Sequence, residues 1–342
     1  MKKVVCFGEV MMRLSPPGYL RFGQGNSLDL NFGGAEANVA VSLANYGDKA
    51  QYLTKLPENP LADACIQQLR GFGVDVSAIA RGGERMGIYF MEKGASMRPS
   101  KVVYDRAHSA ISQVEEGDFD WEEILKDAGW FHTTGITPAL SDASAAVTIQ
   151  AVETAKKLGV PVSCDLNYRK KLWSREKAKE VMGKIVPCVD VLIANEEDAY
   201  DVFGLKAEGS DIEGGKLSAE GYRDLARKLA AQFGCKKVAF TLRESRSAND
   251  NGWSALLYDS ATDTYVLSDH YDIHIVDRVG GGDSFGGGLI HSLMKGDSDQ
   301  DAIRFAAAAS ALKQTIEGDL NLVSEAEVKS LLKNGGSGRV QR

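Results

Sequence analysis

Short apolar runs alternate with longer amphipathic segments along most of this 342-residue chain. The runs have the continuous apolar character of buried strands, whereas the longer segments carry apolar residues at helical spacing. One such segment begins after Gly33-Gly34 and stops at Gly47, as helices that end at a glycine do. The pattern predicts strands at 4–7, 51–54, 129–133, 160–165, 190–195 and 237–242, and helices at 35–45, 61–72, 143–158 and 219–233. This alternation is typical of βαβ units, so we expect an α/β protein with helices on both faces of a mostly parallel sheet.

Two stretches interrupt this alternation. Residues 10–32 are rich in glycine and contain no helix-period pattern, and residues 85–106 hold two strand-like runs separated by a polar loop. Strands without crossover helices do not join a parallel sheet easily, so we expect a small β lid over its carboxyl edge. We therefore assign three kinds of region: an α/β core of 1–9, 33–84 and 109–334, a lid of 10–32 and 85–108, and a flexible glycine-rich tail of 335–342.

Composition narrows the function classes. Apolar residues make up 44% and charged residues 25%, which is ordinary for a soluble globular chain and excludes general disorder. Forty basic and forty-seven acidic side chains give a net charge of −7, which argues against nucleic-acid binding and against a basic membrane-surface protein. The five cysteines form no CxxC pair, and we find neither an export signal nor an apolar run of about 20 residues. We expect a cytoplasmic protein with reduced thiols that acts on small molecules, without nucleic-acid or membrane partners.

The most informative segment is the glycine loop, Gly280-Gly281-Gly282, and the aspartate that follows it. The loop follows an apolar run at 274–276 and begins a helical pattern that continues to Leu293. Three glycines at a helix start let backbone N–H groups converge into an anion hole, a site that stabilises phosphoryl oxygens or developing negative charge. Asp283 lies in the first turn, where its carboxylate can accept a proton from a hydroxyl group. The pair suits phosphoryl transfer to an alcohol; the alternative is a plain helix N-terminus capped by an aspartate.

Other ligand motifs fit less well. The stretch 210–217 lacks the first glycine and the hydroxyl residue of a Walker A loop. A dinucleotide-binding GxGxxG pattern fails at 280–285, because its last position is Phe285 and it comes late in the chain. His270 and His274 lie in a strand-like segment without a carboxylate motif, so we do not interpret them as metal ligands.

The segment 280–285 resembles the GAGDSF signature of the ribokinase-like (PfkB) carbohydrate kinases, with Gly281 in place of the usual alanine. Residues 33–38 are similar to the N-terminal substrate loop of that family, and the likeness extends over nearly the whole chain. The resemblance implies a ribokinase-like three-layer α/β/α core with a mostly parallel central sheet and a small β-strand lid. It also implies ATP and Mg²⁺ as cofactors, and it leaves a monovalent cation such as K⁺ open.

Finer similarities concern the substrate. Segments 104–110, 165–169, 241–245 and 317–323 are similar to those of 2-keto-3-deoxygluconate kinases. A keto acid carries a carboxylate, which favours recognition by arginine. Arg106 on the lid and Arg169 after a strand end can both reach the carboxyl edge of the sheet, where ligands of α/β proteins bind. The alternative for each is a surface ion pair.

The resemblance assigns roles residue by residue. Asp283 is the expected base, and the backbone of Gly280, Gly281 and Gly282 the expected anion hole. The expected substrate-binding residues are Gly34, Asn38, Tyr89, Tyr104, Arg106, Arg169 and Asp283. The expected nucleotide-binding residues are Asn167, Asn195, Thr241, Arg243, Gly280 and Gly282, with the helix at 301–315 closing the adenine slot.

Two positions depart from the family pattern. The NxxE segment that helps to hold Mg²⁺ reads Asn195-Glu196-Glu197-Asp198 here. Asp198 is one methylene shorter than glutamate, so either a water bridges it to the metal or Glu197 takes part. Arg243 stands where the family often has glycine, so it is open whether its side chain touches phosphate or substrate.

These observations favour an ATP-dependent kinase for the 6-hydroxyl of 2-keto-3-deoxygluconate. The alternatives are a kinase for another sugar (fructose, tagatose-phosphate or 2-keto-3-deoxygalactonate) or a non-catalytic sugar sensor, which would not need Asp283. Exposed lid strands also predict a homo-oligomer, a dimer or higher, that covers their edges.

Overall fold

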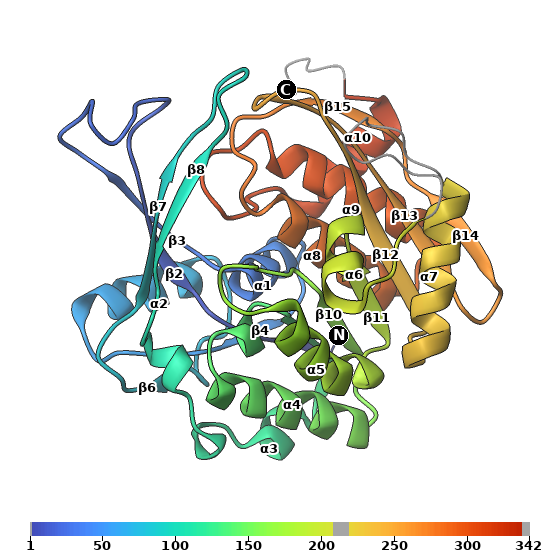
Figure 1. Cartoon of the computed structure of the whole chain (residues 1–342), viewed down its shortest axis with the longest axis horizontal. Coiled ribbons are helices and arrows are strands. Elements are labelled where there is room, and N and C mark those ends of the chain that lie inside the picture. Colours follow the sequence, from blue (N-terminus) through green and yellow to red (C-terminus); the bar gives the residue numbers. More distant parts are fainter. Residues whose placement is uncertain (1, 208–218, 337–342) are drawn as a thin grey trace.

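A nine-stranded sheet runs through the computed structural model, which describes residues 2–207 and 219–336 (Figure 1). Its strands are β1 (Lys3–Phe7), β4 (Ala50–Leu53), β9 (Ala128–Thr134), β10 (Val162–Asp165), β11 (Val191–Ala194), β12 (Lys237–Ser245), β13 (Asp250–Asp259), β14 (Thr264–Leu267) and β15 (Tyr271–His274). They lie in the order β14-β13-β12-β11-β10-β9-β1-β4, with β15 also paired to β13. The pairs from β12 to β4 are parallel, so the prediction of a mostly parallel sheet is confirmed.

Helices cover both faces of this sheet and make three layers. They are α1 (Ala35–Asn45), α2 (Pro60–Gly71), α3 (Trp121–Leu125), α4 (Asp142–Lys157), α5 (Arg175–Ile185), α6 (Glu196–Phe203), α7 (Ala219–Phe233), α8 (Gly281–Lys295), α9 (Asp299–Lys313) and α10 (Glu325–Asn334). Short 3₁₀ turns add η1 (Ala110–Gln113), η2 (Glu116–Asp118), η3 (Thr137–Ala139) and η4 (Val186–Cys188). Along β1, Val5 and Phe7 pack in the core under α3, α4, α5 and α7, whereas Val4 and Cys6 pack in the core under α1, α2, α8 and α9. This alternation is what a strand covered on both faces requires.

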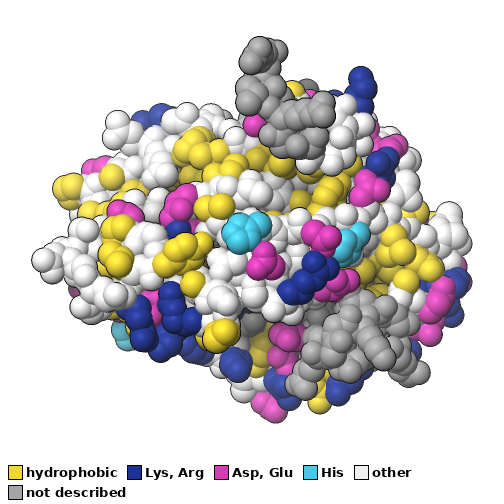
Figure 2. Space-filling view, turned by 90° about the horizontal axis from the view of Figure 1, so that it is seen from above, with side chains coloured by type: hydrophobic (Ala, Val, Ile, Leu, Met, Phe, Trp, Pro, Cys, Tyr) yellow, Lys and Arg dark blue, Asp and Glu magenta, His cyan; other side chains and the backbone are white. Residues whose placement is uncertain are grey.

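A separate four-stranded sheet stands beside the core (Figure 1). It consists of β2 (Met11–Ser15), β3 (Asp29–Gly33), β7 (Gly87–Glu92) and β8 (Lys101–Asp105), in the order β3-β2-β7-β8. We call it the lid, because its strands come from the two segments without crossover helices. Large hydrophobic side chains on the lid and its loops are exposed: Tyr19, Leu20, Phe22, Leu28, Leu30, Met97, Val103 and Tyr104. Hydrophobic side chains gather on the lid side of the face in Figure 2. A further pair, β5 (Lys55–Leu56) and β6 (Ala80–Arg81), lies outside both sheets.

The end of the large sheet differs from the prediction. Strand β12 extends to Ser245 and pairs with β13 in antiparallel fashion, and β13 pairs with β14 and β15 in the same way. The predicted strand at 274–276 is wrong in position, since β15 ends at His274, opposite the first residue of β13. Beyond it the backbone of Val276 donates to the carbonyl of Gln314. The glycine loop therefore follows an antiparallel edge strand.

All five cysteines are free thiols, and four of them (Cys6, Cys65, Cys164 and Cys235) are buried. Burial raises the pKa of each of these thiols, and it also raises the pKa of the half-buried Cys188. No helix in the described ranges has the length and apolar character needed to cross a membrane. The Walker-like stretch at 210–217 and all but the first two residues of the predicted tail lie outside the described residues.

Candidate active site

A cleft of about 1190 Å³ opens at the carboxyl edge of the parallel strands, between the core and the lid. Every residue for which the sequence suggested a role lines it: Gly34, Asn38, Tyr89, Tyr104, Arg106, Asn167, Arg169, Asn195, Glu197, Asp198, Thr241, Arg243, Gly280, Gly281, Gly282 and Asp283. These residues come from segments up to about 250 positions apart, and the sheet edge brings them together. A cleft of this size with convergent polar groups is the usual form of a small-molecule site.

The glycine loop forms one wall of the cleft and leads directly into α8. Gly280 is the N-cap and has a φ of 79°, in the left-handed region that favours glycine. A Cβ atom on Gly280 would lie 1.9 Å from the carbonyl oxygen of Asp319, so a larger residue would displace the loop after α9. No side chain caps the start of α8, although the N–H of Gly281 donates to the carbonyl of Arg278 over 3.3 Å. Gly280, Gly281 and Gly282 all line the cleft, and an uncapped helix start suits a phosphoryl group.

Asp283 and Asn38 form the hydrogen bond that joins the two family-like motifs. Nδ2 of Asn38 on α1 donates to Oδ2 of Asp283 on α8 over 2.7 Å. Oδ1 of Asn38 accepts from the backbone N–H of Gly34 over 3.3 Å, so the amide is held at both ends. Burial raises the pKa of Asp283 to about 6, and the Asn38 hydrogen bond and the nearby Arg169 charge oppose this rise. Asp283 can therefore accept a proton near neutral pH.

Arg169 lies among three carboxylates that line the same cleft: Asp165, Asp198 and Asp283. Burial raises the pKa of Asp165 well above its ordinary value, with repulsion from Asp198 and Asp283 adding to the effect. Burial raises the pKa of Asp198 to about 6, and Arg169 opposes the rise. Sequence reasoning gave Asp165 no role, although an aspartate that ends a buried strand was a usable signal. The cluster carries more negative than positive charge, which suits a bound cation.

The NxxE-like segment is held by its own hydrogen bonds. Oδ1 of Asn195 caps α6 by accepting from the backbone N–H of Asp198 over 2.8 Å. Oδ1 of Asp198 accepts from the backbone N–H of Tyr168 over 2.9 Å, while Glu197 is exposed beside it. The described residues contain no group of three His, Cys, Asp or Glu side chains able to hold a metal directly. The donors present fit a hydrated Mg²⁺, which Asp198 and Glu197 would hold through water.

Two arginines lie close together near the glycine loop. Arg243 on β12 is exposed, and Arg278 immediately precedes Val279 and the glycines. Burial lowers the pKa of Arg278, and the charge of Arg243 lowers it further. Two neighbouring cations suit a polyphosphate, and Thr241 and Asn167 line the same cleft. Sequence reasoning gave Arg278 no role, although its position just before the glycine loop could have indicated one.

The lid residues have protein partners as well as exposure to the cleft. Arg106 pairs with the buried carboxylate of Glu9, whose Oε1 also accepts from Oγ of Ser109 over 3.1 Å. The guanidinium of Arg106 lies 5.3 Å from the ring centroid of Tyr104, and its buried Nε has no hydrogen-bond partner. The hydroxyl of Tyr89 donates to Asp319. Arg106 thus keeps a donor without a partner, whereas the hydroxyl of Tyr89 is engaged.

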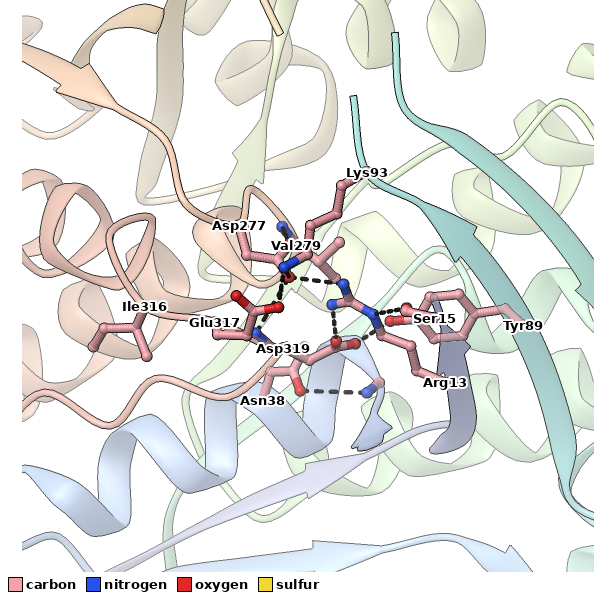
Figure 3. A network of polar contacts seen from close by, with 12 residues as sticks. Arg13, Ser15, Asn38, Tyr89, Lys93, Asp277, Val279, Ile316, Glu317 and Asp319 are labelled. Carbon is pink, nitrogen blue, oxygen red and sulfur yellow. Dashed lines mark hydrogen bonds and ion pairs between the residues drawn. The ribbon is translucent and has the colours of Figure 1, made fainter. Parts of the chain in front are cut away.

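A buried network connects the lid to the glycine loop (Figure 3). Arg13 on β2 is 1% exposed and donates to Oδ2 of Asp277 and to Oδ1 of Asp319, each over 2.7 Å. Lys93, which directly follows β7, pairs with Glu317, and its Nζ lies 3.9 Å from Oδ2 of Asp277. These acidic residues lie just before the glycine loop and just after α9. The lid is therefore joined to both segments beside the anion hole by the buried ion pairs of Arg13 and by the pair of Lys93 with the exposed Glu317.

Comparisons with known proteins agree with this geometry. The profile of the pfkB family carbohydrate kinases matches residues 1–325. The crystal structure of a 2-dehydro-3-deoxygluconokinase from Thermotoga maritima is 50% identical, with a TM-score of 0.94, and the match covers 98% of this chain and 100% of that one. A 2-dehydro-3-deoxygalactonokinase from Haloferax volcanii is 34% identical over 98% of both chains. A 2-dehydro-3-deoxygluconokinase from Bacillus subtilis is 29% identical over 93% of this chain and 91% of its own.

Proposed function

This chain belongs to the pfkB family of carbohydrate kinases, and we propose that it transfers the γ-phosphoryl group of ATP to the 6-hydroxyl of 2-keto-3-deoxygluconate. That compound is the 2-dehydro-3-deoxygluconate of the relatives' names, and the products are its 6-phosphate and ADP. The observation that carries the proposal is the position of Asp283, a carboxylate with a pKa of about 6, in the first turn of the helix that the glycine loop begins. A sugar sensor would not need a base beside an anion hole, so this pair favours an enzyme.

Asp283 accepts the proton of the 6-hydroxyl as its oxygen attacks the γ-phosphorus. The new O–P bond forms while the bond between the γ-phosphorus and the β,γ-bridging oxygen breaks, and ADP leaves with those electrons. The N–H groups at the start of α8, from Gly280 to Gly282, face the oxygens of the transferring group. Asn38 holds the carboxylate of Asp283 toward the sugar.

The nucleotide lies along β12 and the glycine loop in this proposal. Thr241, Arg243, Asn167 and Asn195 line that part of the cleft, and Arg278 adds a second positive charge for the phosphates. Mg²⁺ bound through water to Asp198 and Glu197 would offset charge on the phosphates. The last turns of α9 and the loop after it close the adenine slot.

Arg169 and Arg106 bind the acid end of the substrate. Both line the cleft, and a guanidinium is well suited to bind a carboxylate through charge-assisted hydrogen bonds. Gly34, Asn38, Tyr89 and Tyr104 bind the sugar hydroxyls. Gly34 lines the cleft, and only glycine fits there, since a Cβ would lie 1.9 Å from the carbonyl oxygen of Glu9.

The galactonate epimer is the second candidate substrate. The specific reason is the Haloferax volcanii enzyme, which is named for that epimer and is 34% identical over nearly the whole chain. The two epimers share the carboxylate and the 6-hydroxyl, so the same base and arginines serve either of them.

We also assign the lid a role in assembly. Its outer strands β3 and β8 leave edges uncovered, and Leu30 and Val103 on them are 48% and 55% exposed. Pairing of two lids would cover both the edges and the apolar side chains, so the proposal is a homo-oligomer formed through the lid. The use of ATP together with five free thiols supports a cytoplasmic setting.

The decisive experiment is coupled ADP release with Mg-ATP against a small set of acceptors: 2-keto-3-deoxygluconate, its galactonate epimer, fructose, ribose and tagatose-6-phosphate. We expect turnover with the keto acids and at most weak turnover with the neutral sugars. Preference for a neutral sugar would keep the kinase and overturn the substrate. No turnover with any acceptor, by a protein that still binds ATP, would favour the sensor.

A further inference from the structure

A buried lysine lies directly behind the glycine loop. Lys313 is the last residue of α9, and its side chain is fully buried. Its Nζ donates to the backbone carbonyl oxygens of Gly318 over 2.6 Å and of Asp277 and Ile316 over 3.3 Å each. All three of these acceptors are backbone carbonyls, so the ammonium occupies a cage of peptide oxygens.

This cage joins the two segments that build the anion hole. Asp277 lies three positions before Gly280, and Ile316 and Gly318 belong to the loop after α9. The two segments touch at Gly280, where a Cβ would lie 1.9 Å from the carbonyl oxygen of Asp319 and 3.3 Å from Cε of Lys313. The side chain of Lys313 therefore packs beside Gly280, the residue that begins the anion hole.

The cage holds a charge at neutral pH. Burial lowers the pKa of Lys313 to about 8, while the carboxylates of Asp277 and Asp319 oppose the decrease. The ammonium form is therefore still the main form at pH 7. Those same carboxylates hold Arg13 on their other side, so the positive charge is compensated within the network of Figure 3.

A ring of backbone carbonyls around one positive charge is the kind of site that binds a large monovalent cation, because carbonyl oxygens replace its hydration shell. Here the ammonium of Lys313 already takes three of the oxygens, so a free ion would have to displace a positive charge that the chain itself supplies. A bound K⁺, which the sequence left open, therefore does not fit this cage.

We propose that Lys313 is a built-in substitute for a monovalent cation: its ammonium locks the 277–280 and 316–319 segments together, positions the anion hole, and makes the kinase independent of K⁺. The inference rests on the proposed kinase activity. Lys313 is a positioning residue in this scheme, since the glycine loop lies between it and the transferring phosphoryl group.

The test begins with the unmodified enzyme in buffers whose only cations are Mg²⁺ and a bulky organic amine. We expect full turnover there and less than a twofold change when K⁺ is added. A strong stimulation by K⁺ would overturn the proposal. Absence of any turnover, with or without K⁺, would instead count against the proposed function.

The second part removes the ammonium. Lys313→Ala empties the cage, and we expect kcat to fall by roughly 10-fold or more, with K⁺ or NH₄⁺ restoring much of it. The same ions should raise the thermal midpoint of this variant and leave that of the unmodified protein unchanged. Lys313→Met keeps a long, unbranched side chain in the cage but removes its charge, so the turnover of this variant should stay low in every salt. Lys236→Ala removes an exposed surface lysine and should change neither rate nor salt response.

A folded Lys313→Ala variant that keeps full activity, or one whose loss and thermal midpoint K⁺ and NH₄⁺ do not change, would overturn the cation-substitute role. If that variant does not fold, the K⁺ titration of the unmodified enzyme decides the question.

Discussion

Nδ2 of Asn38 lies 2.7 Å from Oδ2 of Asp283, although the two residues are 245 positions apart. This hydrogen bond joins the start of α1 to the start of α8 across the cleft. Asn38 stabilises the ionised form of Asp283, the form that accepts a proton, against the burial that disfavours it.

Replacement of Asp283 by asparagine keeps the size of the side chain and removes the base. We expect kcat to fall by roughly 100-fold or more, with little change in ATP affinity, because proton transfer is lost while the glycine loop remains. Steady-state kinetics and nucleotide titration would measure the two effects. Normal turnover by Asp283→Asn would exclude Asp283 as the base.

The pH profile of kcat/KM should decrease on the acid side with a midpoint near 6, where Asp283 takes up a proton. Asn38→Ala removes a hydrogen bond to the ionised carboxylate, so this midpoint should move to higher pH. Asn45→Ala, at the other end of α1, is the matched control and should leave the midpoint in place. An unchanged midpoint in Asn38→Ala would contradict the coupling of the two residues.

Replacement of Arg169 by alanine should raise KM for the keto acid by about 10- to 100-fold, because a charge-assisted hydrogen bond to the carboxylate is lost. The exposed Arg227 on α7 gives the control, since Arg227→Ala removes the same charge far from the cleft. Initial rates over a range of keto-acid concentrations would distinguish the two variants. An unaltered KM in Arg169→Ala would exclude its role at the acid end.

Arg13→Met leaves Asp277 and Asp319 buried without their arginine, so we expect the free energy of unfolding to fall by about 3–5 kcal/mol. Arg13→Lys should recover only part of this loss, because an ammonium does not bridge two carboxylates as a guanidinium does. Arg81→Met breaks the more exposed pair with Asp63 and should cost less than about 1 kcal/mol. Denaturant titrations would compare the three variants, and equal losses in Arg13→Met and Arg81→Met would contradict the prediction.

The oligomer proposed to form through the lid should dissociate when a charge is placed on an outer strand. Leu30→Glu on β3 should lower the mass measured by light scattering at micromolar concentration, because an unpaired carboxylate would be buried between lids. Leu158→Glu, exposed at the end of α4, should leave the mass unchanged. A monomeric unmodified protein would count against the assembly itself.

The parallel part of the fold was predictable because its strands and helices carry strong periodic patterns. Helices α1 and α7 have the bounds that the spacing predicts. Helix α8 begins within the glycine loop, as the sequence also predicts. The antiparallel strands β13 to β15 were not predictable in this way, since their polar and apolar residues do not follow one helix or strand period.

The buried charges of the site could not be derived from local sequence. Arg13 reads as an exposed lid residue until the fold brings Asp277 and Asp319 to it from 264 and 306 positions away. Lys313 likewise reads as the basic last turn of a helix, and only the tertiary structure encloses its ammonium in carbonyl oxygens. Long-range partners decide whether such side chains are buried, and periodicity carries no information about them.

Burial makes the native cysteines of this protein poorly reactive toward thiol reagents. Four thiols are enclosed in the core with raised pKa values, and the fifth, Cys188, is half-buried with a raised pKa of its own. Thiol reagents react with the thiolate, so a cysteine introduced at Met97, 92% exposed beside the lid, would be labelled ahead of all five. A fluorophore attached there would report movement of the lid during turnover without prior removal of any native cysteine.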